Sequence, residues 1–167
     1  MMHYTPCQLR ETVGITQETY RHWRKALSPL SRVCGRGAYF TPGDLVAVAV
    51  VRVLCTDLDM RVRTLSSLAE ALFKTCRTTP WPTLERGHLD LDIPGGTVDF
   101  KIDNSPAPVD GVAVSVPLRS IINRLQAHFI DIGAPDPQHT LRFPPTAVQG
   151  TDNKAKEHTC SAMEQKL

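Results

Sequence analysis

A threonine and proline pair followed by a capping side chain occurs twice in this chain, and it constrains the fold of the first half. Thr5 can cap a helix, Pro6 suits the first helical turn, and Gln8 completes a capping box. Residues 41–44 (TPGD) repeat the arrangement. Residues 45–51 follow directly, so this apolar run is predicted to be helical, although its β-branched residues also suit a buried strand.

A helix, a tight turn and a second helix are predicted over residues 5–26. Gly14 can take the left-handed conformation that ends the first helix, and Thr16 can cap the second. Within the second helix, Tyr20, Trp23 and Leu27 share an inward face. The opposite surface is polar and mainly basic, and its members are Gln17, Glu18, Arg21, His22, Arg24 and Lys25.

Two more elements are predicted before residue 78. Pro29 is expected to stop the second helix, and Gly35 and Gly37 allow a short hairpin over residues 32–40. A further helix over residues 62–75 has a single apolar stripe. The stripe consists of Leu65, Leu68, Ala69, Leu72 and Phe73.

The first 75 or so residues resemble the winged helix-turn-helix DNA-binding domain of the MerR family. Residues 5–14 and 15–23 (ITQETYRHW) carry the helix-turn-helix part, residues 40–45 (FTPGDL) the start of the third helix, and residues 60–73 the fourth. The resemblance implies a double-stranded DNA-binding domain over residues 1–78. Its recognition helix would run from Thr16 to Lys25, with a wing from Arg32 to Tyr39.

Two departures from the MerR pattern limit what the resemblance implies. Residues 36–38 (RGA) stand where the family has a glycine-tyrosine-arginine run, so the usual arginine contact of the wing does not follow. A hairpin rather than a long dimerising coiled coil is predicted after Phe73. The two-fold dimer of the family and its small-molecule effector are therefore not implied.

The candidate DNA-binding residues divide into those that position the protein and those that read bases, because phosphate contacts carry no sequence information. The candidate phosphate contacts are Lys25, Arg32, Arg36 and Arg63. The candidate base contacts are Thr16, Gln17, Glu18 and Arg21. The predicted surface is completed by Tyr20, His22, Arg24 and Tyr39. The alternative is that Arg21 and Arg24 only solubilise an exposed helix.

A second module is predicted over residues 79–132, after a proline-rich boundary at residues 78–82. Apolar and polar residues alternate over residues 88–102 on both sides of a turn, which predicts a β-hairpin. A strand is predicted next, over residues 112–116. Pro117 is expected to open a helix that runs to about Phe129, and its apolar side chains are expected to face the hairpin. Those side chains are Leu118, Ile121, Ile122 and Leu125. Residues 133–167 are expected to be a mostly disordered tail.

The predicted class is therefore α+β, with a four-helix winged helix-turn-helix, a small ββ-β-α module and a flexible tail. The charge is uneven. Residues 1–78 contain 11 Lys and Arg against 6 Asp and Glu, whereas residues 79–132 contain 4 against 7. A basic first module fits nucleic acid, and an acidic second module points to a different partner or to self-association.

Enzymatic, metal-binding and membrane functions find little support in the sequence. The five cysteines show no paired spacing and are read as reduced thiols. Asp90 and Asp92 alternate with apolar residues, which predicts a solvated sheet face rather than a metal or catalytic pair. No cofactor motif, signal stretch or membrane-spanning run is present. We expect a cytoplasmic protein that is not an enzyme and needs no cofactor.

The leading expectation is a sequence-specific transcription regulator that acts with RNA polymerase, as an activator or a processive antiterminator. Residues 79–132 would contact the polymerase. This layout resembles the AlpA-type antiterminators of prophage and pyocin lysis loci. Two alternatives stay open: an excisionase or architectural DNA-bending protein, and an antitoxin-like module whose main partner is another protein.

Overall fold

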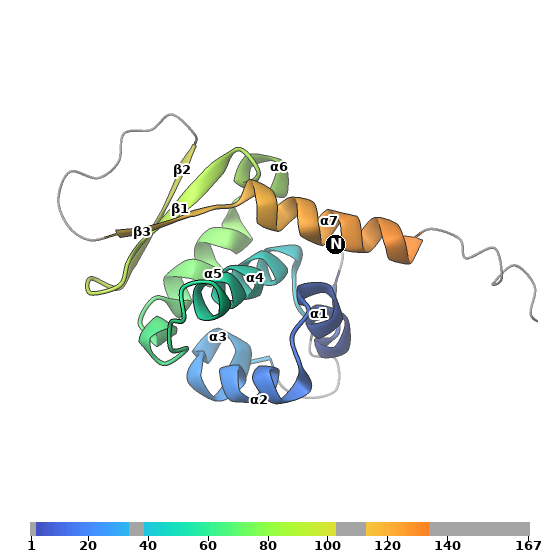
Figure 1. Cartoon of the computed structure of the whole chain (residues 1–167), viewed down its shortest axis with the longest axis horizontal. Coiled ribbons are helices and arrows are strands. Elements are labelled where there is room, and N and C mark those ends of the chain that lie inside the picture. The colour runs from blue at the N-terminus through green and yellow to red at the C-terminus, as the bar shows by residue number, and fades with distance from the viewer. Residues whose placement is uncertain (1–2, 34–38, 103–112, 134–167) are drawn as a thin grey trace, which may run out of the picture. The chain divides into compact units, whose positions relative to one another are not determined.

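The computed structural model describes residues 3–33, 39–102 and 113–133, with side chains as far as Phe129. These residues form helices and a three-stranded antiparallel sheet, so the chain is α+β (Figure 1). The helices are α1 (Pro6–Val13), α2 (Gln17–Ala26), α3 (Ser28–Ser31), α4 (Pro42–Thr56), α5 (Ala69–Thr78), α6 (Trp81–Leu84) and α7 (Arg119–Gly133). The strands are β1 (Gly87–Asp92), β2 (Thr97–Ile102) and β3 (Ala113–Pro117). No helix within the described ranges is long and apolar enough to cross a membrane.

Both predicted capping boxes are present and begin helices. The Thr5 and Thr41 hydroxyls accept hydrogen bonds from the backbone N–H groups of Gln8 and Asp44, each at 3.3 Å. The apolar run at residues 45–51 is therefore helical, as the cap predicted. Every residue from Gly43 to Val51 is buried, so α4 is the central helix of the core.

Helix α4 lies very close to α5 at its N-terminal end. A Cβ atom added to Gly43 would come within 2.7 Å of the Arg77 Cα atom, so only glycine fits at this contact. The buried Asp44 carboxylate accepts a hydrogen bond from Arg77 Nε at 2.6 Å. The Asp44 carboxylate thus caps α4 and also binds Arg77 in the C-terminal turn of α5.

The hairpin is confirmed, and the third strand joins it in the order β2-β1-β3. Leu89 of the central strand faces Phe100 of β2 and Val116 of β3. Helix α5 packs against β2, and α6 packs against β1 and β2. The sheet is therefore attached to the helical core mainly through α5 and α6.

Asp90 was expected on a solvated sheet face, and this expectation is wrong. Its side chain is 7% exposed because β1 is the central strand and neighbours flank it on both sides. Lys101 Nζ lies 2.9 Å from the carboxylate as an ion pair, and His88 Nε2 lies 3.6 Å away. Desolvation raises the pKa of Asp90, but polar contacts with Lys101 and Ser115 and the nearby positive charges outweigh it and leave the pKa below its ordinary value.

Several predicted helix ends are also corrected. Pro29 lies in the first turn of α3 rather than stopping a helix, and Pro117 ends β3 rather than opening α7. The helix expected from residue 62 begins at Ala69, after a 3₁₀ turn at Thr64–Ser66. Its predicted apolar stripe is nevertheless buried.

The predicted boundary at residues 78–82 does not separate two compact units, because residues 1–134 form one. Helix α7 packs mainly against α1, α4 and α6 rather than against the hairpin. Its predicted apolar residues are buried as expected, and they are Leu118, Ile121, Ile122 and Leu125. The tip of the predicted wing (residues 34–38) and the predicted tail beyond residue 133 lie outside the described residues.

Candidate nucleic-acid interface

The turn between α1 and α2 is fixed by contacts from both helices and from α4. Gly14 ends α1 with a φ of 73°, and its N–H donates to the Arg10 carbonyl at 2.8 Å. The Thr16 hydroxyl accepts from the Thr19 N–H at 3.1 Å and so caps α2. Arg52 of α4 donates to the Val13 carbonyl, placing a positive charge at the C-terminal end of α1. These contacts hold α2 in one orientation relative to α1.

The inner face of α2 is anchored in the core. Tyr20 and Trp23 are 6% and 5% exposed, and the Tyr20 ring packs edge-on against Phe40 at 6.5 Å between centroids. Tyr20 was a candidate DNA-binding residue. The structure places it in the core, where its ring supports α2 from behind, so its side chain is not available at the outer surface.

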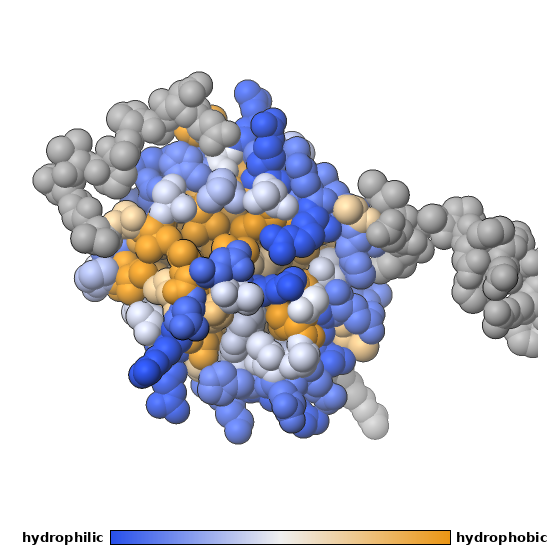
Figure 2. Space-filling view, in the orientation of Figure 1, coloured by the Kyte–Doolittle hydropathy of each residue, from blue (hydrophilic) through white to orange (hydrophobic). Residues whose placement is uncertain are grey.

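The outer face of α2 is exposed along its whole length. Gln17, Glu18 and His22 are exposed, as are the three cationic residues of the helix. Figure 2 shows mainly hydrophilic residues along the lower edge of the molecule, where Figure 1 places α2. The charge on this face is positive overall, because Glu18 is its one acidic residue.

The cationic residues of α2 converge on an open pocket. It has a volume of about 470 Å³ and is lined by Arg21, Arg24, Lys25 and Ser31. Arg21 and Lys25 make no ion pair with any residue that the structure describes. A concave surface with three cationic side chains and a hydroxyl suits an anionic oxygen ligand such as a backbone phosphate.

Arg32, a second phosphate candidate, has an acidic partner that the sequence did not reveal. Its Nη2 atom lies 2.8 Å from the Glu70 carboxylate, which also accepts a hydrogen bond from the Ser28 hydroxyl at 2.7 Å. The two charged side chains are 71% and 53% exposed, so water weakens the pair. A phosphate at Arg32 would therefore compete with Glu70, and no local pattern links residues 38 positions apart.

The remaining candidate DNA-binding residues lie outside α2. Arg63 is exposed at the 3₁₀ turn, which packs against α5. Tyr39 is 55% exposed, and its ring lies 5.7 Å from that of His3. Arg36 lies outside the described residues.

Metal-ligating side chains and thiols among the described residues were natural candidates for a different chemistry. No group of three or more His, Cys, Asp or Glu side chains among them could hold a metal ion. Cys7, Cys55 and Cys76 are free thiols. Burial and the nearby Asp44 charge raise the pKa of the Cys76 thiol to about 12, so it stays protonated near neutral pH.

The surface thus combines an anchored helix with an exposed, cationic outer face. It is suited to binding a polyanion. Comparisons with protein-family models, curated proteins and solved structures find no match to this chain.

Proposed function

We propose that this chain binds double-stranded DNA through α2 and regulates transcription. The observation that carries the proposal is the outer face of α2, where three cationic side chains line one pocket while the opposite face is anchored in the core. A helix held in this way can enter the major groove without losing its own support. The resemblance of residues 4–75 to a MerR-type domain supports the same assignment.

The proposed contacts follow from side-chain chemistry and position. Gln17 and Arg21 lie one turn apart on the exposed face and can make paired hydrogen bonds to base edges. Lys25 lies in the last turn of α2, where a long cationic side chain suits a phosphate. Thr16 uses its hydroxyl to cap the helix, so its contribution is to fix the N-terminal turn that meets the bases.

The regulatory mode is proposed from the resemblance and the charge distribution together. The block at residues 79–132 is net acidic and contains the sheet and most of α7. We propose that this part of the chain contacts RNA polymerase while α2 holds DNA, giving activation or antitermination. A net negative charge over residues 79–132 disfavours contact of this part of the chain with the duplex and is compatible with a protein partner.

The first test is a selection of binding sites from random duplex DNA with the full-length protein, followed by titration of the selected site. Arg21→Ala should cost about 1–3 kcal/mol of specific binding and relax preference at one base position. Lys25→Ala should weaken all sequences about equally and lower the salt slope by about one. Arg119→Ala, exposed on α7, is the matched control and should bind as the wild type does.

If no sequence is enriched, or if Arg21→Ala and Arg119→Ala behave alike, α2 is not a reading helix. The regulatory mode is tested separately by transcription in vitro on a template that carries the selected site before a terminator. Increased readthrough with the protein present supports antitermination. Unchanged readthrough and unchanged initiation would rule out action through polymerase while leaving DNA binding intact.

A further inference from the structure

The outer edge of β2 has no neighbouring strand among the residues that the structure describes. The strand order β2-β1-β3 places β2 beside β1 only, at one border of the sheet (Figure 1). The strand is six residues long, contains no proline, and pairs with β1 in unbroken register over its whole length. A regular edge of this kind can extend its ladder with another strand, because its outward peptide groups are aligned for pairing.

The apolar side chains of β2 are only partly covered. Val98, Phe100 and Ile102 alternate along the strand and share a face of the sheet with Leu89 and Leu91 of β1. The two leucines are fully buried, whereas Val98 and Phe100 are half-buried and Ile102 is 54% exposed. Burial therefore decreases from the central strand toward this edge, and a strand added there would cover the three side chains.

The opposite face of β2 carries one charge of each sign. Asp99 is exposed, stands across from Asp90, and makes no ion pair with any residue that the structure describes. Lys101 is held by Asp90, with Nζ 2.9 Å from the carboxylate. An ammonium group has three donors, so Lys101 can bind a second carboxylate from the open side. A strand that suits this edge therefore places a cation opposite Asp99 and an anion opposite Lys101.

A second copy of β2 meets this requirement in one register. When two copies pair antiparallel about a two-fold axis, one residue lies opposite itself. With Phe100 on the axis, Asp99 lies opposite the partner's Lys101, and Val98 lies opposite the partner's Ile102. With Asp99 or Lys101 on the axis, two like charges lie directly opposite each other, which is destabilising. An axis at Val98 or Ile102 overlaps at most three residues of the strand.

We propose that two copies of this chain associate by antiparallel pairing of their β2 strands, centred on Phe100. The pairing joins two three-stranded sheets into one of six strands. Because the interface uses the same strand of both copies, the assembly closes at two. The overlap is short, so the association should be weak and should require a high protein concentration.

The pairing does not involve α2, so it is independent of DNA binding. It also differs from the coiled-coil dimer of the MerR family, because the joint is a sheet edge. A two-fold pair carries two copies of α2, so a duplex that engages both would contain an inverted repeat.

Sedimentation velocity of the full-length protein, from about 5 µM to about 500 µM, tests the association. We expect a monomer at the low end, a dimer at the high end, and nothing larger. Asp99→Lys places a lysine opposite the partner's Lys101 and should raise the dissociation constant roughly tenfold. Within one copy it relieves the contact with Asp90, so the fold is retained. Asp57→Lys makes the same charge change at the exposed end of α4 and should dimerise as the wild type does.

The register is tested by NMR on a mixture of ¹³C-labelled and unlabelled protein at the high concentration. Within one copy, Val98 and Ile102 are four residues apart along a strand, roughly 13 Å, which is too far for an NOE between their methyl groups. We expect this NOE in a spectrum filtered for contacts between copies.

The proposal is overturned if the protein stays monomeric at the highest concentration, or if Asp99→Lys and Asp57→Lys dimerise alike. A dimer without the contact between Val98 and Ile102 also overturns it. Growth beyond the dimer would have the same consequence, because an open series indicates that β2 of one copy pairs with a different surface of the next.

Discussion

At the scale of single residues, Asp90 is the most informative side chain, because its position contradicts its sequence pattern. Alternation along β1 correctly assigns Asp90 to the polar face of the strand. It does not reveal that Lys101 and Ser115, on the two flanking strands, cover the carboxylate from both sides. Periodicity predicts which face a side chain takes, whereas burial depends on the neighbours that the topology supplies.

Asp90→Asn should lower the free energy of unfolding by about 1–3 kcal/mol near neutral pH, since it leaves the half-buried Lys101 without a counter-charge. The folded-state pKa of Asp90 lies below the unfolded value of about 3.8, so its contribution is present above that value and is lost as pH falls through the folded pKa. Urea unfolding of both proteins from neutral pH to below pH 4 should show the difference shrinking.

Asp99→Asn is the matched control for this measurement. Asp99 is exposed and stands directly opposite Asp90, so its removal relieves a like-charge contact and should cost no stability. An equal loss in both variants, or a loss in Asp90→Asn that does not depend on pH, would contradict the role given to the ion pair.

At the scale of secondary-structure elements, the best predictions come from signals that act within a few residues. The capping boxes at Thr5 and Thr41 and the turn at residues 93–96 are local, and each element they predict is present. Pro29 and Pro117 show the limit of this reasoning. A proline fits the first turn of a helix or the end of a strand equally well, so its effect depends on how the following residues pack.

The contact between α4 and α5 gives a prediction at this scale. Gly43→Ala should cost about 1–3 kcal/mol or more, because the added methyl group meets the backbone of α5 rather than a side chain that can move. Gly96→Ala is the comparison, since an added Cβ there would meet only Ser67 at ordinary contact distances of 3.7–3.8 Å, but the φ of 68° should cost about 1–2 kcal/mol. Both values follow from chemical unfolding, and a Gly43→Ala protein as stable as the wild type would disprove the steric argument.

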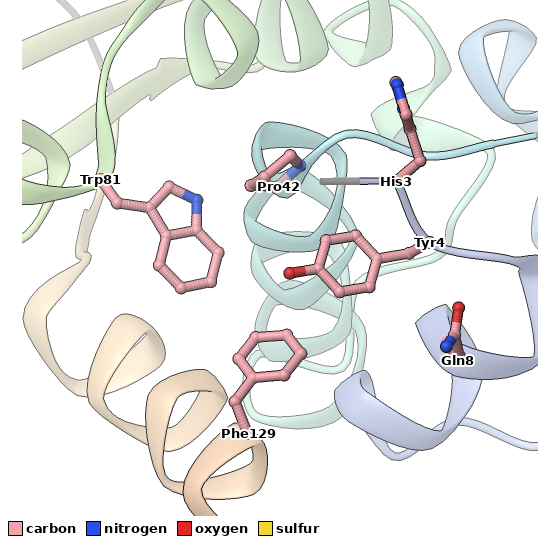
Figure 3. Close-up of a pocket in the computed structure, with 6 residues that line it drawn as sticks. All are labelled: His3, Tyr4, Gln8, Pro42, Trp81 and Phe129. Carbon is pink, nitrogen blue, oxygen red and sulfur yellow. The ribbon is translucent and has the colours of Figure 1, made fainter. Parts of the chain in front are cut away.

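At the scale of the molecule, two features of the surface differ in how far the sequence predicts them. The exposed face of α2 follows from the amphipathic spacing of one helix, so the positions of Arg21, Arg24 and Lys25 could be predicted. An aromatic pocket is assembled from α1, α4, α6, α7 and the N-terminal segment (Figure 3). No local pattern relates Tyr4, Trp81 and Phe129, and the pairing of Arg32 with Glu70 escaped prediction for the same reason.

Because α7 packs on α1 and α4, we expect that residues 1–78 do not fold as a unit by themselves. Removing α7 would expose surfaces of α1 and α4 and would remove the buried side chains of Ile121, Ile122 and Leu125, each worth roughly 1.5–3 kcal/mol. A fragment of residues 1–78 should lack a cooperative urea transition, whereas residues 1–134 should retain one. A cooperative transition for the shorter fragment, with the midpoint of the full chain, would show that α7 is dispensable.

The contact between α7 and α1 also determines when this protein can fold during its synthesis. Helix α1 leaves the ribosome before α7, and its partner surface on α7 is translated more than one hundred residues later. Contacts of such long sequence separation slow folding and leave apolar surface uncovered on the growing chain. We therefore expect that α1 and α4 complete their packing only after nearly all of residues 1–134 have been synthesised.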